Sequence, residues 1–379
     1  MKPPFHAEHI GSFVRPPRLI EAARAHKAGK LDDAGWRLTQ DDCIREIAAF
    51  QESIGLPSIT DGEFRRRSWS AGFIDAVEGF GLRDGTLGFR NESGVMGVAS
   101  SPYAKQPLKR KHRIVADDYR FLRSVVKRGV PKVTIAAPDV MHWFLGPQAF
   151  EPAYRDREAF FADLSAIYKA EIAELAKEGC KYLQLDDTAL PCNCDPNARK
   201  DVVTRGENPD ELTERYSRLF NDCIAAKPAD MAVAIHLCRG NLKGAWMAEG
   251  GYAPIADALF NRLNADIYCL EYDTPRAGDF SKRRTCSSRT AAGTASSRKR
   301  SSAPVFASRC ACRISRSCRW CSSAATSSSP CRRVSRASSS AGASSSHCRR
   351  RYRSRSPMSA CTGTSASRPT PGTAGCGNR

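Results

Sequence analysis

Short apolar runs of strand length alternate along this chain with segments in which apolar residues follow helical spacing. Helical spacing is found in residues 44–48, 160–175 and 212–223. Strand-length runs occupy residues 9–13, 58–61, 133–136, 182–185, 233–236 and 266–270. Since strands that alternate with amphipathic helices form parallel sheets covered by helices, the pattern predicts a parallel α/β fold.

Polar residues fall at the carboxyl-terminal end of nearly every predicted strand, and their position distinguishes an open sheet from a barrel. They are Ser12, Asp61, Glu63, Asp139, Asp186, Asp187, His236, Cys238 and Glu271. The loops at the top of a (β/α)8 barrel would gather all of them in one place, so we expect a TIM-barrel-like fold. Residues 76–115, which carry several glycines and a basic run, are expected to form an excursion from that barrel.

The composition changes abruptly after Phe280. The 379-residue chain has a formal net charge of +19, but residues 281–379 hold 19 Arg and 2 Lys and contain no Asp, Glu, Leu or Gln. Residues 1–280 keep 38 basic residues against all 40 acidic ones, a net charge of −2. We therefore expect an incomplete barrel over residues 1–280, with about six of the eight strands, and a disordered Ser-, Arg- and Cys-rich tail over residues 281–379.

Composition also excludes several classes of protein. No run approaches the roughly 18 consecutive apolar residues of a membrane span, and the first residues lack the apolar core of a signal peptide. The 7 cysteines of residues 1–280 suit an intracellular protein with reduced thiols, so we expect a cytoplasmic location. A nucleic-acid partner is not favoured despite the basic tail, because the tail offers only one Tyr and one Trp for stacking on bases.

Two soft metal ligands stand at alternate positions of one predicted strand. His236 and Cys238 would point to the same face, and Glu271 at the end of the next strand offers a third ligand. A set that contains a thiolate favours Zn²⁺ over Mg²⁺ or Ca²⁺. The alternative is structural, namely a hydrogen-bonded histidine and a small core cysteine. Cys192 and Cys194 form a rival ligand pair, although the residues around them indicate a loop.

Two carboxylates at strand ends are candidates for substrate binding. Glu63 and Asp186 could bind an ammonium group or act as an acid or base. The alternative is an ordinary helix cap or a salt bridge with an arginine such as Arg65 or Arg66. The chain contains neither a glycine-rich phosphate loop nor a Gly-x-Ser-x-Gly nucleophile elbow, so the chemistry of those motifs is not indicated.

Five segments, taken in order, resemble the cobalamin-independent methionine synthases and their shorter one-barrel relatives. The matching segments are His9-Ile10-Gly11-Ser12-Phe13, Asp61-Gly62-Glu63 followed by Arg65-Arg66 and Trp69, residues 183–190 (LQLDDTAL), His236-Leu237-Cys238, and residues 265–271 (ADIYCLE). Five ordered matches are much more specific than any one of them. The resemblance therefore strengthens the zinc assignment and weakens the rival cysteine pair.

The resemblance implies a catalytic barrel that moves a methyl group from a methyltetrahydrofolate polyglutamate to homocysteine, forming methionine. Zinc would bind the homocysteine thiol as a thiolate, which then attacks the N5-methyl group. The implied zinc ligands are His236, Cys238 and Glu271. The residues that match the family's amino-acid site are Ser12, Glu63 and Asp186. Trp143 could offer a face to the pterin ring.

The chain departs from the family pattern in two respects. It lacks the separate N-terminal barrel, so it is similar to the short type, whose methyl donor the sequence does not identify. The family's fourth zinc ligand, a later Cys, and its acid–base His have no recognisable counterpart after Phe280, so no catalytic residue is assigned. The tail is typical of a GC-rich gene translated out of frame, which predicts an impaired chain. Alternatives are alkyl transfer to another thiol such as coenzyme M, or a non-functional remnant.

Overall fold

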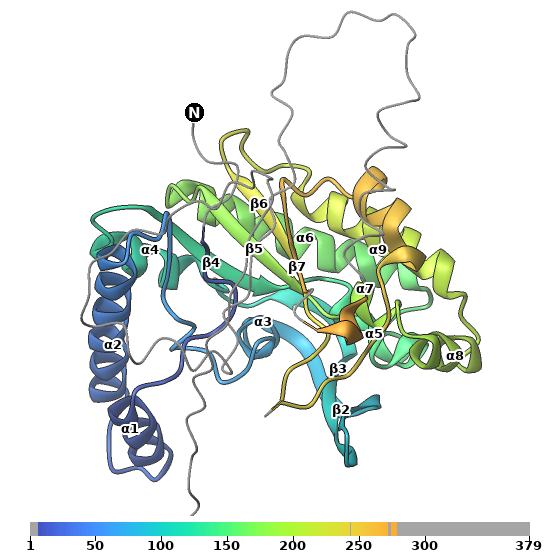
Figure 1. Ribbon diagram of the computed structural model, residues 1–379, viewed down its shortest axis with the longest axis horizontal. Coiled ribbons are helices and arrows are strands. Elements are labelled where there is room, and N and C mark those ends of the chain that lie inside the picture. Colours follow the sequence, from blue (N-terminus) through green and yellow to red (C-terminus); the bar gives the residue numbers. More distant parts are fainter. Residues whose placement is uncertain (1–6, 243, 272–273, 279–379) are drawn as a thin grey trace, which may run out of the picture. The chain divides into compact units, whose positions relative to one another are not determined.

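Five parallel strands form one curled sheet, which makes up half of a barrel (Figure 1). The computed structural model describes residues 7–242, 244–271 and 274–278. The strands lie in the order β1 (Ser58–Thr60), β4 (Val130–Ala136), β5 (Tyr182–Asp187), β6 (Ala232–Leu237) and β7 (Ile267–Leu270). The predicted parallel α/β fold is therefore confirmed, and so are five of the predicted strand positions.

Helices cover the outer face of the sheet, and their sequences explain where they begin. Asp156 caps α6 (Arg157–Lys177) by accepting the Ala159 N–H at 2.8 Å, and Asn208 caps α9 (Pro209–Ile224). Both helices bury the predicted apolar face against the sheet. The other helices are α1 (Pro17–Lys27), α2 (Asp33–Ser53), α3 (Ala71–Ala76), α4 (Ala116–Val125), α5 (Val140–Trp143), α7 (Ala189–Cys192) and α8 (Pro196–Thr204), with short turns at Gly146–Ala149, Ala253–Ile255, Ala258–Arg262 and Pro275–Ala277.

Residues 76–115 lie outside the parallel sheet, as predicted. Strands β2 (Val77–Asn91) and β3 (Gly94–Arg110) form a separate antiparallel hairpin (Figure 1). Near its tip, Arg90 and Trp246 exchange two backbone hydrogen bonds of 2.8 Å. The Arg90 guanidinium also lies 2.5 Å from the buried carboxylate of Asp195. The hairpin thus ties the loop after β5 to the loop after β6.

The predicted sixth strand, residues 9–13, is wrong, because this segment does not pair with a neighbouring strand. It crosses the inner face of the sheet, where side chains satisfy its backbone. Lys132 Nζ donates to the His9 carbonyl at 2.6 Å, and Gln184 Nε2 donates to the Ile10 carbonyl at 3.0 Å. Ile10 is buried against side chains of β5, β6 and β7. The described sheet therefore has five strands rather than six.

Strands β1 and β7 are the outer strands of the described sheet. The tail predicted for residues 281–379 lies outside the described residues, and so do the strands that a closed barrel would add after β7. Among the helices of residues 7–242, 244–271 and 274–278, none is long and apolar enough to cross a bilayer. The features that position the candidate site are therefore the inner face and the carboxyl-terminal edge of the five-stranded sheet.

Candidate active site

The ends of the central strands bring candidate residues from distant segments side by side. In the register of the parallel pairs, Asp186 of β5 is the partner of His236 of β6, and His236 is the partner of Cys269 of β7. Side chains in one such row point to the same face, and neighbouring strands lie about 4.8 Å apart. Asp186, predicted to bind the amino acid, and His236, predicted to bind the metal, are therefore neighbours on the inner face.

Glu63 stands in a strained turn directly after β1. Its φ of 60° lies in the left-handed region, and in the described part of the chain it is the only non-glycine residue with a positive φ. Asp61 Oδ1 accepts the Glu63 N–H at 2.8 Å, and Thr60 Oγ1 accepts the Gly62 N–H at 3.1 Å. A side chain held in a strained turn at a strand end indicates a functional site.

The carboxylates of Glu63 and Asp186 converge on the guanidinium of Arg66. Nη2 of Arg66 forms an ion pair with Glu63 and lies 3.8 Å from Oδ2 of Asp186. Burial raises the pKa of Glu63 to about 7 and the pKa of Asp186 to about 6, while the charge of Arg66 opposes both shifts. The structure thus brings the two predicted carboxylates together and places between them an arginine that the sequence suggested as an alternative partner.

Ser12 lies beside this turn, on the segment that crosses the sheet. The Phe13 N–H donates to the Gly62 carbonyl at 3.2 Å, and Arg15 donates to the Glu63 carbonyl at 3.2 Å. These two bonds hold the Ser12 segment next to Glu63. Ser12 is exposed, so a ligand that lies over the turn can reach its hydroxyl group.

A buried chain of polar side chains supports Asp186. Gln184 Nε2 donates to Asp186 Oδ1 at 2.7 Å, and Gln184 Oε1 accepts from Lys132 Nζ at 3.1 Å. The fully buried Lys132 also pairs with Glu8 at 2.9 Å. Sequence reasoning missed Lys132 and Glu8. The sequence signal that could have identified Lys132 is a lysine within an otherwise apolar strand, at a position that shares the inner face with Thr134.

Replacing Lys132 with methionine should lower the free energy of unfolding by about 3–5 kcal/mol, because the buried Glu8 carboxylate then loses its cation. Urea denaturation followed by circular dichroism measures this change. The matched control is Lys181→Met, which removes an exposed ion pair with Asp230 and should leave the midpoint close to that of the unmodified chain. Equal midpoints for the two variants would contradict a structural role for Lys132.

The three proposed zinc ligands lie at the ends of two neighbouring strands. His236 is the penultimate residue of β6, Cys238 follows that strand, and Glu271 follows β7. Glu271 Oε2 accepts the Arg239 N–H at 2.9 Å, and its Oε1 lies 3.2 Å from the Arg276 guanidinium. The strand positions therefore agree with the prediction, while the carboxylate of Glu271 is turned toward two arginines.

Within the ranges that the structure describes, no three His, Cys, Asp or Glu side chains lie close enough together to hold a metal ion. The donor set nevertheless fits Zn²⁺, because it combines an imidazole, a thiol and a carboxylate. His236 Nδ1 donates to the Cys269 carbonyl at 3.2 Å, an arrangement typical of histidines that bind a metal through Nε2. Zinc binding at Glu271 would have to compete with Arg276.

Asp139 and Asp187, which also end strands, do not reach the inner face. Their carboxyl groups hydrogen-bond to each other in a buried position, and burial raises the pKa of both. Asp187 Oδ1 accepts the backbone N–H groups of Ala189 and Leu190 at the start of α7. Because side chains alternate along a strand, Asp187 faces the helices while Asp186 faces the site.

Trp143 cannot offer its face to a pterin ring, so that expectation is wrong. The side chain is fully buried in α5, where its ring meets the Tyr216 ring edge-on at 6.3 Å. The rival pair Cys192 and Cys194 is buried as well, and burial raises the pKa of Cys194 to about 11. A buried thiol that stays protonated suits a core residue better than a metal ligand.

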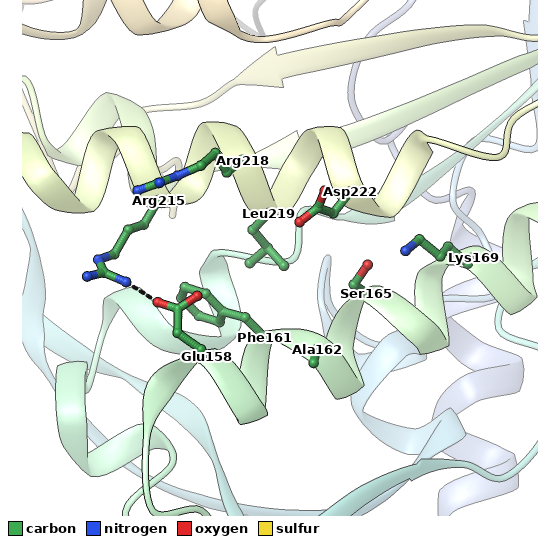
Figure 2. Close-up of a pocket in the computed structure, with 9 residues that line it drawn as sticks. All are labelled: Glu158, Phe161, Ala162, Ser165, Lys169, Arg215, Arg218, Leu219 and Asp222. Atoms are coloured by element: carbon green, nitrogen blue, oxygen red, sulfur yellow. Dashed lines mark hydrogen bonds and ion pairs between the residues drawn. The ribbon is translucent and has the colours of Figure 1, made fainter.

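A groove of about 540 Å³ lies on the outer helix layer, between α6 and α9 (Figure 2). Figure 2 shows Arg215 of α9 reaching toward Glu158 of α6 across this groove. Lys169, Arg218 and Asp222 also line it. None of the predicted site residues lines this groove. We therefore assign the candidate active site to the strand ends and not to the groove.

The fold and the strand-end residues define a barrel-type α/β enzyme whose site lies on the inner, carboxyl-terminal edge of a parallel sheet. Residues 5–271 match the family described as the catalytic domain of the cobalamin-independent synthases. The chain belongs to the cobalamin-independent methionine synthase family, the 5-methyltetrahydropteroyltriglutamate–homocysteine methyltransferase type. The family resemblance predicted from the five segments is confirmed.

The chain is also similar to individual proteins. The chain is 35% identical to the uncharacterized protein YxjH of Bacillus subtilis over 282 residues, which cover 74% of this chain and 73% of that protein. It is 28% identical to the methionine synthase of Saccharolobus solfataricus over 240 residues, 61% of this chain and 62% of that protein. A candidate vitamin-B12-independent methionine synthase from Listeria monocytogenes has a similar structure, with a TM-score of 0.56 and 28% identity over 76% of this chain and 86% of that chain.

Proposed function

We propose that this chain transfers a methyl group from a 5-methyltetrahydrofolate-type donor to homocysteine, with Zn²⁺ held by His236, Cys238 and Glu271. The observation that carries the proposal is the register pair of Asp186 and His236 on the inner face. It sets a carboxylate suited to an ammonium group beside an imidazole suited to a metal. Homocysteine carries its ammonium and its thiol on one short chain, so a single molecule can reach both.

The residues of this chain bind and orient the amino acid. Glu63 and Asp186 supply negative charge for its ammonium group, and Ser12 lies beside them. When bound, zinc lowers the pKa of a thiol and supplies a thiolate near neutral pH. In the reaction a sulfur–carbon bond forms while the bond between the methyl carbon and N5 of the donor breaks, and N5 takes up a proton. The residue that supplies this proton is not assigned.

Replacing Asp186 with asparagine should weaken homocysteine binding and leave the zinc content unchanged. A hydrogen bond to a charged group contributes about 1.5–3 kcal/mol, so we expect the dissociation constant to rise roughly 10- to 150-fold. Titration calorimetry and metal analysis of the same preparations measure the two effects. Asp230→Asn, at an exposed position, is the control. Loss of zinc with unaltered homocysteine binding would show that Asp186 serves the metal.

Coenzyme M is an alternative methyl acceptor. Arg66 could bind its sulfonate, because a guanidinium group pairs well with a sulfonate. The two acidic partners of Arg66 favour an amino acid instead. Methyl-transfer assays with both thiols separate the alternatives. Transfer to coenzyme M without transfer to homocysteine would overturn the proposed acceptor.

We also propose that the activity of this chain is impaired. Strand β7 is an outer strand of the described sheet, and a closed barrel needs further strands beside it. Residues 281–379 are poor in the large apolar residues from which such strands are built. The family's fourth zinc ligand and its acid–base histidine would also come from this part of the chain. A reading-frame change near Ser281 explains both losses.

A further inference from the structure

Glu271 is deeply buried after β7, and neighbouring groups hold it in place. Its side chain is only 1% exposed. Tyr252 Oη accepts the Glu271 N–H at 3.2 Å and donates to the Glu271 carbonyl at 3.3 Å. The Arg239 N–H donates to Oε2 of Glu271 at 2.9 Å. These bonds fix the backbone of Glu271 and one of its two carboxylate oxygens.

The second carboxylate oxygen of Glu271 faces a cation. Nη2 of Arg276 donates to Oε1 of Glu271 at 3.2 Å, from a side chain that is 21% exposed. The guanidinium of Arg239 points elsewhere, over the Tyr252 ring at 4.7 Å and toward the Pro191 carbonyl at 3.5 Å. Since a buried carboxylate that loses its cation is strongly destabilising, Arg276 stabilises Glu271 in the metal-free protein.

The backbone of Arg276 is fixed as well. The Gly250 N–H donates to the Arg276 carbonyl at 2.8 Å. Nearby, Gly278 and Gly251 pack backbone against backbone, because a Cβ atom on Gly278 would lie only 2.6 Å from the Cα atom of Gly251. The loop after β7 is therefore held against the loop after β6, and a change of partner involves the side chain of Arg276 alone.

The ring of Trp246 gives the Arg276 guanidinium a second partner. The central carbon of the guanidinium lies 4.6 Å from the ring centroid, where the face of the indole attracts a cation. Trp246 is itself held by its two backbone hydrogen bonds with Arg90 at the hairpin. Arg276 therefore keeps a favourable contact when Glu271 turns to another cation.

Both oxygens of the Glu271 carboxylate are engaged, so metal binding has to displace a partner. The Arg239 N–H belongs to the backbone next to the proposed ligand Cys238, whereas Arg276 contributes a side chain that has a second partner. Charge favours the same exchange, because Zn²⁺ and a guanidinium group repel each other strongly in a buried site. Arg276 is thus the partner that a metal would displace.

We propose that Arg276 is a resident counter-cation of Glu271, which neutralises the buried carboxylate in the metal-free protein and competes with Zn²⁺ for it. This inference rests on the proposed function, because zinc binding at Glu271 is part of that function. Arg276 is a positioning residue under this assignment. It keeps Glu271 folded into the site without metal, and it lowers the zinc affinity of the chain.

A double-mutant cycle on the full chain tests the assignment. The zinc dissociation constant is measured by competition with a chromophoric chelator for the unmodified chain, Arg276→Met, Glu271→Gln and the double variant. Arg276→Met should bind zinc at least about tenfold more tightly, because a hydrogen bond to a charged group no longer has to be broken. In the Glu271→Gln background the same change should alter the affinity less than about threefold, since no carboxylate is left to compete for. Arg262→Met, which removes a cation from an exposed ion pair with Glu214, is the matched control and should keep the unmodified value.

The unfolding midpoints of the same proteins after zinc removal test the pair without metal. Arg276→Met should lower the urea midpoint of the unmodified chain, because the buried carboxylate of Glu271 then lacks this cation. The same change should affect the midpoint of Glu271→Gln much less. Equal losses in the two backgrounds would show that Arg276 stabilises the protein by contacts other than Glu271, and would contradict the inference.

Two results of the zinc titrations would overturn the inference, namely an unchanged dissociation constant in Arg276→Met, or equal tightening with and without the Glu271 carboxylate. If Glu271→Gln does not fold, tryptophan fluorescence replaces it. Zinc should change the fluorescence of the unmodified chain as Arg276 shifts against Trp246, and an equal change in Arg276→Met would contradict the inference. Absence of zinc binding in every protein would instead overturn the proposed function, and the competition with it.

Discussion

Replacing Cys238 with serine should remove bound zinc from the protein. Cys238 follows β6 two residues after His236, and the thiolate is the soft donor that makes the proposed set selective for zinc. Loss of residues that merely orient metal ligands typically lowers metal affinity 10- to 100-fold, so loss of a ligand should lower it at least about tenfold. Metal analysis after dialysis against a defined zinc buffer measures the content of the two proteins.

Cys194→Ser is the matched control, because it removes a thiol from the rival pair. This variant should keep the zinc content of the unmodified chain. Equal zinc content in Cys238→Ser and in the unmodified chain would refute the assignment. Loss of zinc in Cys194→Ser alone would assign the zinc site to the loop after α7. In a chain with methyl-transfer activity, Cys238→Ser should also lower the rate roughly a thousandfold, since activation of the thiol by the metal contributes several kcal/mol.

A chain whose reading frame is corrected after codon 280 should gain homocysteine methyl transfer by at least about a thousandfold. The expected gain has two sources. Closing the barrel would cover the outer edges that β1 and β7 have in the described sheet, and the polar inner face that carries Asp186 and His236. The restored segment would also supply the fourth zinc ligand and the acid–base histidine that the family resemblance implies. The family match ends at residue 271, ahead of the change in composition.

The nucleotide sequence around codons 275–290 is the first measurement. One of the other two forward frames should encode roughly one hundred residues with strand and helix periodicity, a histidine, and a cysteine at a strand end. If neither frame stays open with that pattern, the frameshift account is wrong. Methyl transfer at an ordinary enzymatic rate by the purified 379-residue chain would refute the impairment directly.

Local periodicity was sufficient to predict the five strands of the parallel sheet and three of its helices, α2, α6 and α9. The apolar runs at β4, β5, β6 and β7 and the helical faces of α6 and α9 depend on near neighbours in the sequence, so their order already implied a parallel sheet with its site at the carboxyl ends. The segments around Glu63, Asp186 and His236 also identified the family from sequence alone. These conclusions needed no information on which residues touch.

Only the tertiary structure decided the contacts between distant segments. Residues 9–13 look like a strand, but this segment pairs with no strand of the described sheet, and side chains of β4 and β5 donate to the carbonyls of His9 and Ile10. Trp143 was expected at the site and is buried in the core instead. Arg66 meets Asp186 from a segment 120 residues earlier in the chain. Such contacts depend on strand register and on the curl of the sheet, because these two features bring side chains together across the inner face. A local pattern of apolar and polar residues determines neither feature.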